Sequence, residues 1–182
     1  MAVDVTMLEH HARAILMAIG EDINRPGLAE TPARYARMWR DFIDYEPGST
    51  NTSFESVHAD QMVVVSGMKV WSFCEHHLLP FWADISCGYL TDQKVLGLSK
   101  FARIAHKHAH RLQVQEQLVE QIADEITDHT GTPNVAVLAQ GVHTCMVMRG
   151  IKTEGIMTSS AMRGTFREDP KAREEFLRIL HL

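Results

Sequence analysis

The hydrophobic pattern of this chain changes its period twice, and these changes limit the possible folds more than any other feature. Residues 62–98 hold short runs rich in β-branched and aromatic residues, MVVVS, KVWSF, WADISCGYL and KVLGL, which are typical of strands. Residues 99–129 instead repeat apolar residues every three or four positions, which predicts two helices. The strand pattern then returns in NVAVLAQ, HTCMVMR and IMTSSAM. This order predicts an α+β fold in which helices cover one face of an antiparallel sheet.

Helical segments flank the predicted sheet at both ends of the chain. Two of them precede the strands, and the second begins at Thr31 with a proline in its first turn. A loop with the sequence EPGSTNTS follows, and a last helix begins at Asp169, again with a proline. The sequence therefore predicts an N-terminal helical region at 1–54 and a sheet-containing domain at 55–182.

Composition excludes several classes of protein. The chain has 182 residues, of which 45% are apolar, enough for one buried core. No apolar run reaches about 18 residues, and the N-terminus lacks the pattern of a signal peptide, so we expect a cytoplasmic protein without a membrane span. The net charge of −5 disfavours nucleic acid as a partner. The three cysteines are too few, and odd in number, for a disulfide framework.

Two of these cysteines lie beside histidines, which are unusually numerous at 11 in the chain and cluster near 76–77 and 106–110. In CEHH, Cys74 and His77 are three positions apart, so one tight turn can present a thiolate and an imidazole to the same ion. The alternative is a buried cysteine beside histidines that bond to the backbone. Cys87 has no such neighbour, and we expect it to be an apolar strand residue.

The segment HTCMVMR supplies a second cysteine and strengthens the metal interpretation. If the segment is a strand, His143, Cys145 and Arg149 share one face. Cys74, His77 and Cys145 would then provide three zinc ligands and leave one position open, as in catalytic zinc sites. His143 would lie beside the metal, suited to proton transfer, although it could also be a satisfied core histidine.

Cations begin two of the predicted helices. Lys100 and Arg103 lie in the first turn of a helix that Ser99 is expected to cap, and Arg34 and Arg37 lie in the first turns of an earlier helix. Cations oppose the helix dipole at this end, whereas a bound phosphate would favour them. The alternative is a set of solvated surface cations.

Gln115 and Glu116, in RLQVQEQL, begin the second helix of the pair. A carboxylate can accept two hydrogen bonds from an amidine-like edge such as that of guanine. These two residues could equally lie on an exposed helix surface, and the local sequence leaves both interpretations open.

Several long motifs together resemble the GTP cyclohydrolase I family. They are CEHHLLPF, GYLTDQKVLGLSKFARI, RLQVQEQL, HTCMVMRG and FREDPKAREEFL, and they occur in the family's order. The resemblance covers roughly residues 7–182 and is strongest from residue 62 onward. It implies hydrolysis of GTP at C8, release of formate and rearrangement to 7,8-dihydroneopterin triphosphate.

The resemblance also implies a role for each candidate residue of the reaction centre. Cys74, His77 and Cys145 would bind Zn²⁺, and His76 and His143 would be the catalytic acid–base histidines. The family's tunnelling fold, an antiparallel sheet with two helices on one face, would form the catalytic domain. Ten copies would assemble into a ring with active sites shared between subunits.

Substrate contacts follow from the same resemblance. Glu116 with Gln115 would hold the guanine, and Ser99 would lie near the ribose, where it takes part in proton transfer. The triphosphate would be held by Lys100, Arg103, Arg149, Arg34 and Arg37.

Two other functions are compatible with parts of the pattern. A non-catalytic, zinc-stabilised nucleotide-binding ring requires a fourth protein ligand, and the sequence offers no convincing one. A nitrile reductase of the same fold uses a nucleophilic cysteine and a nicotinamide cofactor without zinc. The complete set of two cysteines and one histidine favours the hydrolase.

Overall fold

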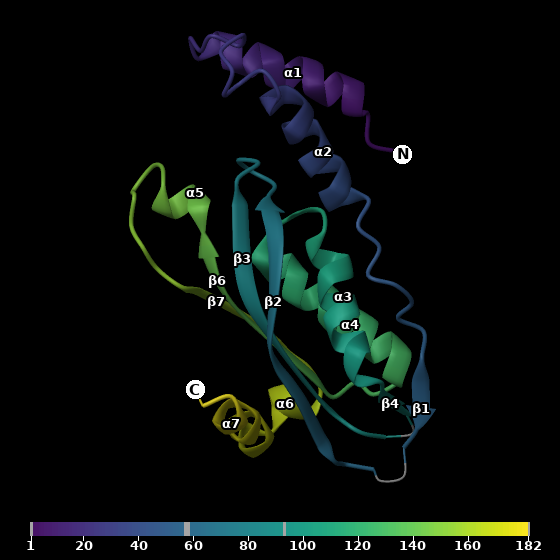
Figure 1. Cartoon of the computed structure of the whole chain (residues 1–182). Helices are drawn as coiled ribbons and strands as arrows, with labels where there is room; N and C mark the ends of the chain where they lie inside the picture. Colours follow the sequence, from purple (N-terminus) through teal and green to yellow (C-terminus); the bar gives the residue numbers. More distant parts are fainter. Residues whose placement is uncertain (1, 57–58, 93, 182) are drawn as a thin grey trace. The chain divides into compact units, whose positions relative to one another are not determined.

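The computed structural model describes residues 2–56, 59–92 and 94–181 (Figure 1). The chain divides into two compact units, Met1–Glu46 and Pro47–Leu182. None of the described helices combines the length and the apolar sequence that a bilayer-spanning segment needs.

The first unit is a pair of helices, α1 (Val5–Ala18) and α2 (Thr31–Ile43), which pack against each other. The side chain of Asp4 caps α1 by accepting a hydrogen bond from the Met7 amide at 2.9 Å. Ala12 of α1 and Trp39 of α2 are buried. The predicted helices are therefore present, and α2 begins at Thr31 as expected.

The second unit contains a five-stranded sheet in the order β5-β2-β3-β6-β7. All neighbouring strands are antiparallel except β2 and β5. The bounds are β2 Met62–Cys74, β3 Pro80–Leu90, β5 Leu112–Gln113, β6 Val135–His143 and β7 Met157–Met162. A separate ribbon pairs β1 (Ser53–Glu55) with β4 (Lys94–Leu96).

The runs MVVVS and KVWSF, predicted as separate strands, form the single strand β2. Its register against β3 shifts between Val65 and Met68. Gly67 lies in this interval with a φ of +73°, a conformation that glycine adopts at little cost. The glycine therefore allows a bulge within one continuous strand where the sequence suggested a turn.

Two helices, α3 (Leu98–Ala109) and α4 (Gln115–Thr130), cover one face of the sheet (Figure 1). Their buried side chains, such as Ile104 and Ile122, join Ile85 and Val137 of the strands in one apolar core. The predicted α+β fold, an antiparallel-rich sheet with two helices on one face after N-terminal helices, is therefore confirmed. Ser99 does not cap α3, because Gly97 occupies the N-cap and Ser99 lies within the first turn.

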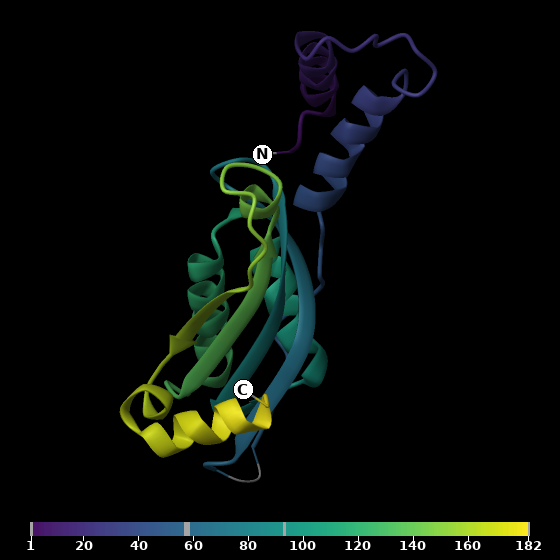
Figure 2. The same ribbon diagram turned by 90° about the vertical axis from the view of Figure 1, so that its left-hand side faces the viewer.

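The other face of the sheet carries a smaller core at its end away from the turn between β2 and β3. There α6 (Thr165–Glu168) and α7 (Pro170–Ile179) place Phe166 and Phe176 against Ala136 and Leu138 (Figure 2). A Cβ at Gly88 would lie 2.8 Å from the Phe176 ring, so the close packing of α7 requires glycine there.

The segment HTCMVMR departs from the expected strand. β6 ends at His143, and residues Thr144–Val147 form a short helix, α5. The ladder with β3 stops where Pro80 begins that strand, and the Thr144 hydroxyl donates to the Pro80 carbonyl at 2.5 Å. The expectation that His143 and Cys145 share a strand face was therefore wrong, because the partner strand ends at this point.

Candidate metal and active site

Cys74, His77 and Cys145 come together at one end of the sheet. Cys74 is the last residue of β2, His77 lies in the turn before β3, and Cys145 lies in α5. Their candidate ligand atoms all lie within 4.8 Å of one another. Leu78, with a φ of +53°, reverses the chain so that its amide donates to the Cys74 carbonyl at 2.9 Å.

The chemistry of this group fits a zinc ion. Cys74 Sγ lies 3.7 Å from His77 Nδ1, and two ligands at tetrahedral positions on zinc are about 3.5 Å apart. Burial and the adjacent Cys74 thiol raise the pKa of Cys145. A divalent cation would reverse this penalty, because it favours the thiolate form of both cysteines. Among the described residues, the group of side chains that could hold a metal ion consists of three ligands, Cys74, His77 and Cys145.

His143 lies at the end of β6, two residues before Cys145. Its ring stacks on Phe81 with the ring centroids 4.5 Å apart, and its Nε2 lies 3.0 Å from Gln115 Oε1. Burial lowers the pKa of His143, and the negative charge of Glu116 acts in the opposite direction. Phe81 and Gln115 therefore fix the position of the His143 ring. Burial favours its neutral form.

Gln115 and Glu116 begin α4, but their side chains have different environments. Gln115 is fully buried, with its amide hydrogen-bonded within the sheet, whereas Glu116 is exposed. Glu116 therefore remains available to a ligand, and it lies close enough to affect the charge of His143.

His76 and Arg149 complete this end of the sheet. The side chain of His76 is 64% exposed, and its Nδ1 lies 3.9 Å from Cys74 Sγ. Arg149 donates from a guanidinium nitrogen to His77 Nε2 at 2.5 Å. Both side chains can therefore meet a molecule bound over the two cysteines.

Ser99, Lys100 and Arg103 lie elsewhere, in the first turns of α3. Lys100 Nζ and an Arg103 guanidinium nitrogen donate to the same carbonyl, Ser49 O, at 2.7 and 3.0 Å. α3 has 12 residues, about 18 Å of helix, and Cys74 pairs with β5, which follows the opposite end of α3. Lys100 and Arg103 precede that end of α3 by nine and six residues, about 14 Å and about 9 Å along the helix axis.

Arg34 and Arg37 belong to α2 of the N-terminal unit. Both side chains are exposed. Arg34 lies in the first turn of the helix, as expected from the sequence. Neither residue shares the Pro47–Leu182 unit with the cysteine group.

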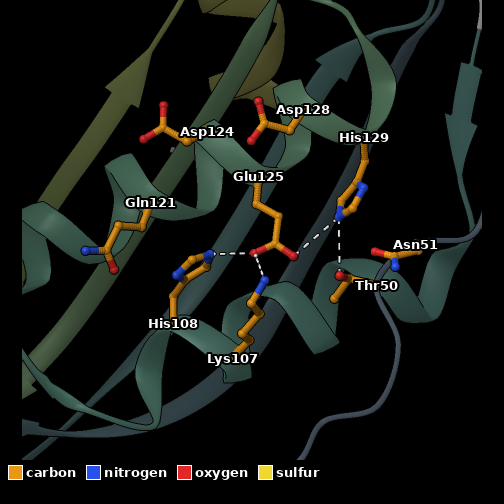
Figure 3. Close-up of a pocket in the computed structure, with 9 residues that line it drawn as sticks. All are labelled: Thr50, Asn51, Lys107, His108, Gln121, Asp124, Glu125, Asp128 and His129. Atoms are coloured by element: carbon orange, nitrogen blue, oxygen red, sulfur yellow. Dashed lines mark hydrogen bonds and ion pairs between the residues drawn. The ribbon is translucent and has the colours of Figure 1, made fainter.

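A polar cleft of about 390 Å³, which was not predicted from the sequence, lies between α3, α4 and residues 50–51 (Figure 3). Its centre is Glu125, which accepts hydrogen bonds from Lys107 at 2.8 Å and His108 at 2.7 Å and contacts His129 at 3.3 Å. Burial alone would raise the pKa of Glu125, but bonds from Lys107, Thr50 and His108 outweigh it and lower the pKa to about 2. The histidine cluster near 106–110 was the only sequence sign of this network.

Cys87 behaves as the sequence predicted. It is fully buried in the core between the sheet and the helices, and burial raises the pKa of its thiol to about 12. Such a thiol is inert as a metal ligand or nucleophile.

The sequence profile and the curated relatives that match this chain all carry the same family name. The sequence profile of GTP cyclohydrolase I matches residues 8–181. GTP cyclohydrolase 1 of Hyperthermus butylicus is 45% identical over 181 residues, which are 99% of this chain and 93% of that protein. GTP cyclohydrolase 1 of Aquifex aeolicus is 42% identical over 181 residues, 99% of this chain and 98% of that protein.

A solved structure, the archaeosine synthase QueF-Like in the apo form, gives a weaker likeness. Its TM-score is 0.40 and its identity 15%, over 57% of this chain and 96% of that chain. This similarity is too low to bear on function, whereas the match of the profile and of the relatives extends over almost the whole sequence. The chain belongs to the GTP cyclohydrolase I family.

Proposed function

We propose that this protein converts GTP into 7,8-dihydroneopterin triphosphate and formate. The observation that carries the proposal is the group of Cys74, His77 and Cys145, with His143 held two residues away from one of its cysteines. The full-length relatives named GTP cyclohydrolase 1 support the same activity.

Cys74, His77 and Cys145 would hold zinc, which supplies Lewis-acid activation of water when bound. Glu116 accepts hydrogen bonds from the guanine edge, so that C8 of the purine faces the cysteines. His143 and His76 exchange protons with the imidazole nitrogens of the substrate, which allows the C8–N bonds to break and formate to leave. The opened ribose then rearranges and closes the new ring, with Ser99 near it.

Three protein ligands, with no fourth in the group found among the described residues, favour a catalytic site over the alternative of a zinc-stabilised binding ring. The cysteine pair with a histidine also disfavours a nitrile reductase, which needs one reactive thiol and no metal. We retain the division into a helical region at 1–54 and a catalytic domain at 55–182, and a cytoplasmic location, as parts of the proposal.

We further propose that the active site is shared between copies of the chain, in the ring of ten that the resemblance implies. Lys100 and Arg103 lie in the first turns of α3, whose opposite end leads to the strand that pairs with Cys74, and in their own chain they bond to Ser49 O. A neighbour's α3 would bring them to the triphosphate, together with Ser99 near the ribose. Arg149 would bind it from the same chain as the cysteines.

The edge of the sheet supports association between copies. β2 pairs with β5 only at Phe73 and Cys74, so most of its outer edge has no partner strand among the described residues. Trp71 and Leu112, both near this edge, are 53% and 42% exposed. An unpaired strand edge with apolar side chains beside it is a surface that another chain can cover. Arg34 and Arg37 would add cations to the shared sites.

The proposed activity is tested by incubating the zinc-loaded protein with GTP and measuring formate and the fluorescence of the oxidised pterin. We expect both products in equal amounts. Zinc-loaded protein that binds GTP but releases no formate would contradict the proposal. Chelation of zinc should abolish formate release, and added zinc should restore it.

A further inference from the structure

The side chain of Gln115 is built into the sheet rather than directed toward a ligand. It is 0% exposed, and its Nε2 donates to the carbonyls of Ala139 at 3.1 Å and Met157 at 3.0 Å. Ser159 Oγ lies 3.1 Å from the same nitrogen. Gly141 makes room for this arrangement, since a Cβ there would lie 2.2 Å from Gln115 Oε1.

These contacts fix which way the amide points. A backbone carbonyl can only accept, so the amide nitrogen must face Ala139 and Met157, and Oε1 must face His143. The amide oxygen can only accept as well. His143 Nε2, 3.0 Å away, must therefore carry the hydrogen of this bond.

We propose that Gln115 is a positioning residue that keeps the hydrogen of His143 on Nε2 and turns Nδ1 toward the substrate. His143 Nδ1 makes no hydrogen bond within the described parts of the chain, so this nitrogen is open. The stack on Phe81 fixes the plane of the ring, and the bond to Gln115 fixes its rotation within that plane. The inference rests on the proposed function and reassigns Gln115, which the family resemblance associates with guanine.

A guanine contact would require a side-chain atom of Gln115 that is both exposed and unbonded. Both ends of the amide have partners within the chain, and no part of the residue is exposed. Glu116, the next residue and exposed, therefore remains the guanine contact. The two neighbours act on different partners because successive residues of a helix point in different directions.

Gln115→Met tests the assignment, because methionine has a similar size and flexibility but cannot accept the bond from His143. We expect zinc content and GTP affinity within about twofold of the original protein. We expect kcat to fall by roughly 10- to 100-fold, the scale found when residues that orient metal-binding histidines are replaced. Solid-state ¹⁵N NMR of histidine-labelled protein reads the tautomer directly. The His143 signals, assigned by their loss in His143→Ala, should show an Nε2–H tautomer that Gln115→Met replaces with a mixture.

Gln113→Met is the matched control. Gln113 is also buried, and its amide donates to His108 O at 3.1 Å and Gln121 Oε1 at 2.9 Å, but it does not touch His143. It should lower stability without changing the His143 tautomer or kcat. An equal fall in kcat in this control would overturn the inference, because the loss of any buried amide would then lower kcat through reduced stability of the domain.

A weaker GTP affinity with unchanged kcat in Gln115→Met would also overturn it and return the residue to the guanine site. If Gln115→Met does not fold, Gln115→Asn keeps an amide but shortens the side chain by one methylene, so that its oxygen no longer reaches His143 Nε2. It should give the same tautomer mixture, and an unchanged His143 spectrum would refute the proposal. The tautomer is measured without turnover, so inactive wild-type protein would contradict the proposed function alone.

Discussion

His108 on α3 donates from Nε2 to Oε2 of Glu125 on α4 at 2.7 Å, and this bond joins the two helices that cover the sheet. Glu125 is the only acid of the cleft in Figure 3 that is buried, at 8% exposure. Its Oε2 also accepts a hydrogen bond from the Lys107 ammonium at 2.8 Å. The packing of α3 against α4 therefore depends on this buried carboxylate.

Replacing this carboxylate should therefore cost stability. We expect Glu125→Gln to lower the free energy of unfolding at neutral pH by about 3 kcal/mol, because a pKa lowered from 4.5 to about 2 corresponds to that difference. Denaturant unfolding at fixed protein concentration measures it. Asp128→Asn, an exposed acid of the same cleft, is the control and should change stability by less than about 0.5 kcal/mol.

The same group predicts how the stability depends on pH. The pKa of Glu125 is lower in the folded protein, so its contribution is complete above about 4.5 and disappears as the pH falls toward about 2. The difference between the original protein and Glu125→Gln should therefore shrink over this interval. A difference that stays constant from pH 6 to pH 3 would show that the Glu125 charge does not stabilise the fold.

The zinc ligands can be separated from the third cysteine by substitution. Cys74→Ser, His77→Ala and Cys145→Ser should each lose bound zinc and formate release, because two remaining ligands hold the ion weakly. Cys87→Ser should keep full zinc and activity, since Cys87 is buried in the core. Metal analysis of the purified proteins decides the matter, and full zinc in Cys145→Ser would remove that residue from the site.

His143→Ala separates proton transfer from metal binding. We expect it to retain zinc and GTP binding but to lose at least about 100-fold in turnover, the usual scale for removal of a general acid or base. Zinc analysis, equilibrium binding of GTP and formate release measure the three properties. Turnover close to that of the original protein would show that His143 serves only the packing against Phe81.

The sequence identified those parts of the site that depend on local geometry. Cys74 and His77 are three residues apart in one turn, so their proximity follows from spacing alone. Cys145 was predicted to lie near them as a strand residue, but it lies in a short helix. The local sequence HTCMVMR does not reveal that the partner strand β3 begins only at Pro80. The tight turn of α5 still brings its thiol to the other two ligands.

Contacts between distant segments were beyond what the sequence could predict. The bond from His143 to Gln115 joins residues 28 positions apart and depends on the absence of a side chain at Gly141. The Glu125 network likewise joins residues of two helices, and its bonds depend on how α3 packs against α4. By contrast, the fold class followed from hydrophobic periodicity, because burial of one face of each element leaves a local repeat in the sequence.

Mixed assemblies test whether two chains build one active site. Lys100→Met/Arg103→Gln protein should bind zinc but bind GTP poorly, because each lost charge-assisted bond costs about 1.5–3 kcal/mol. Cys145→Ser protein should lack zinc but keep both cations. Neither variant has both the cations and the full set of metal ligands, and in a shared site a neighbouring chain supplies what is missing. Unfolding the two variants together and reassembling them should restore part of the formate release.

Each variant reassembled alone is the control, and mass spectrometry verifies that mixed assemblies form. Mixed assemblies as inactive as either parent would place the cations in the site of their own chain and exclude a shared site.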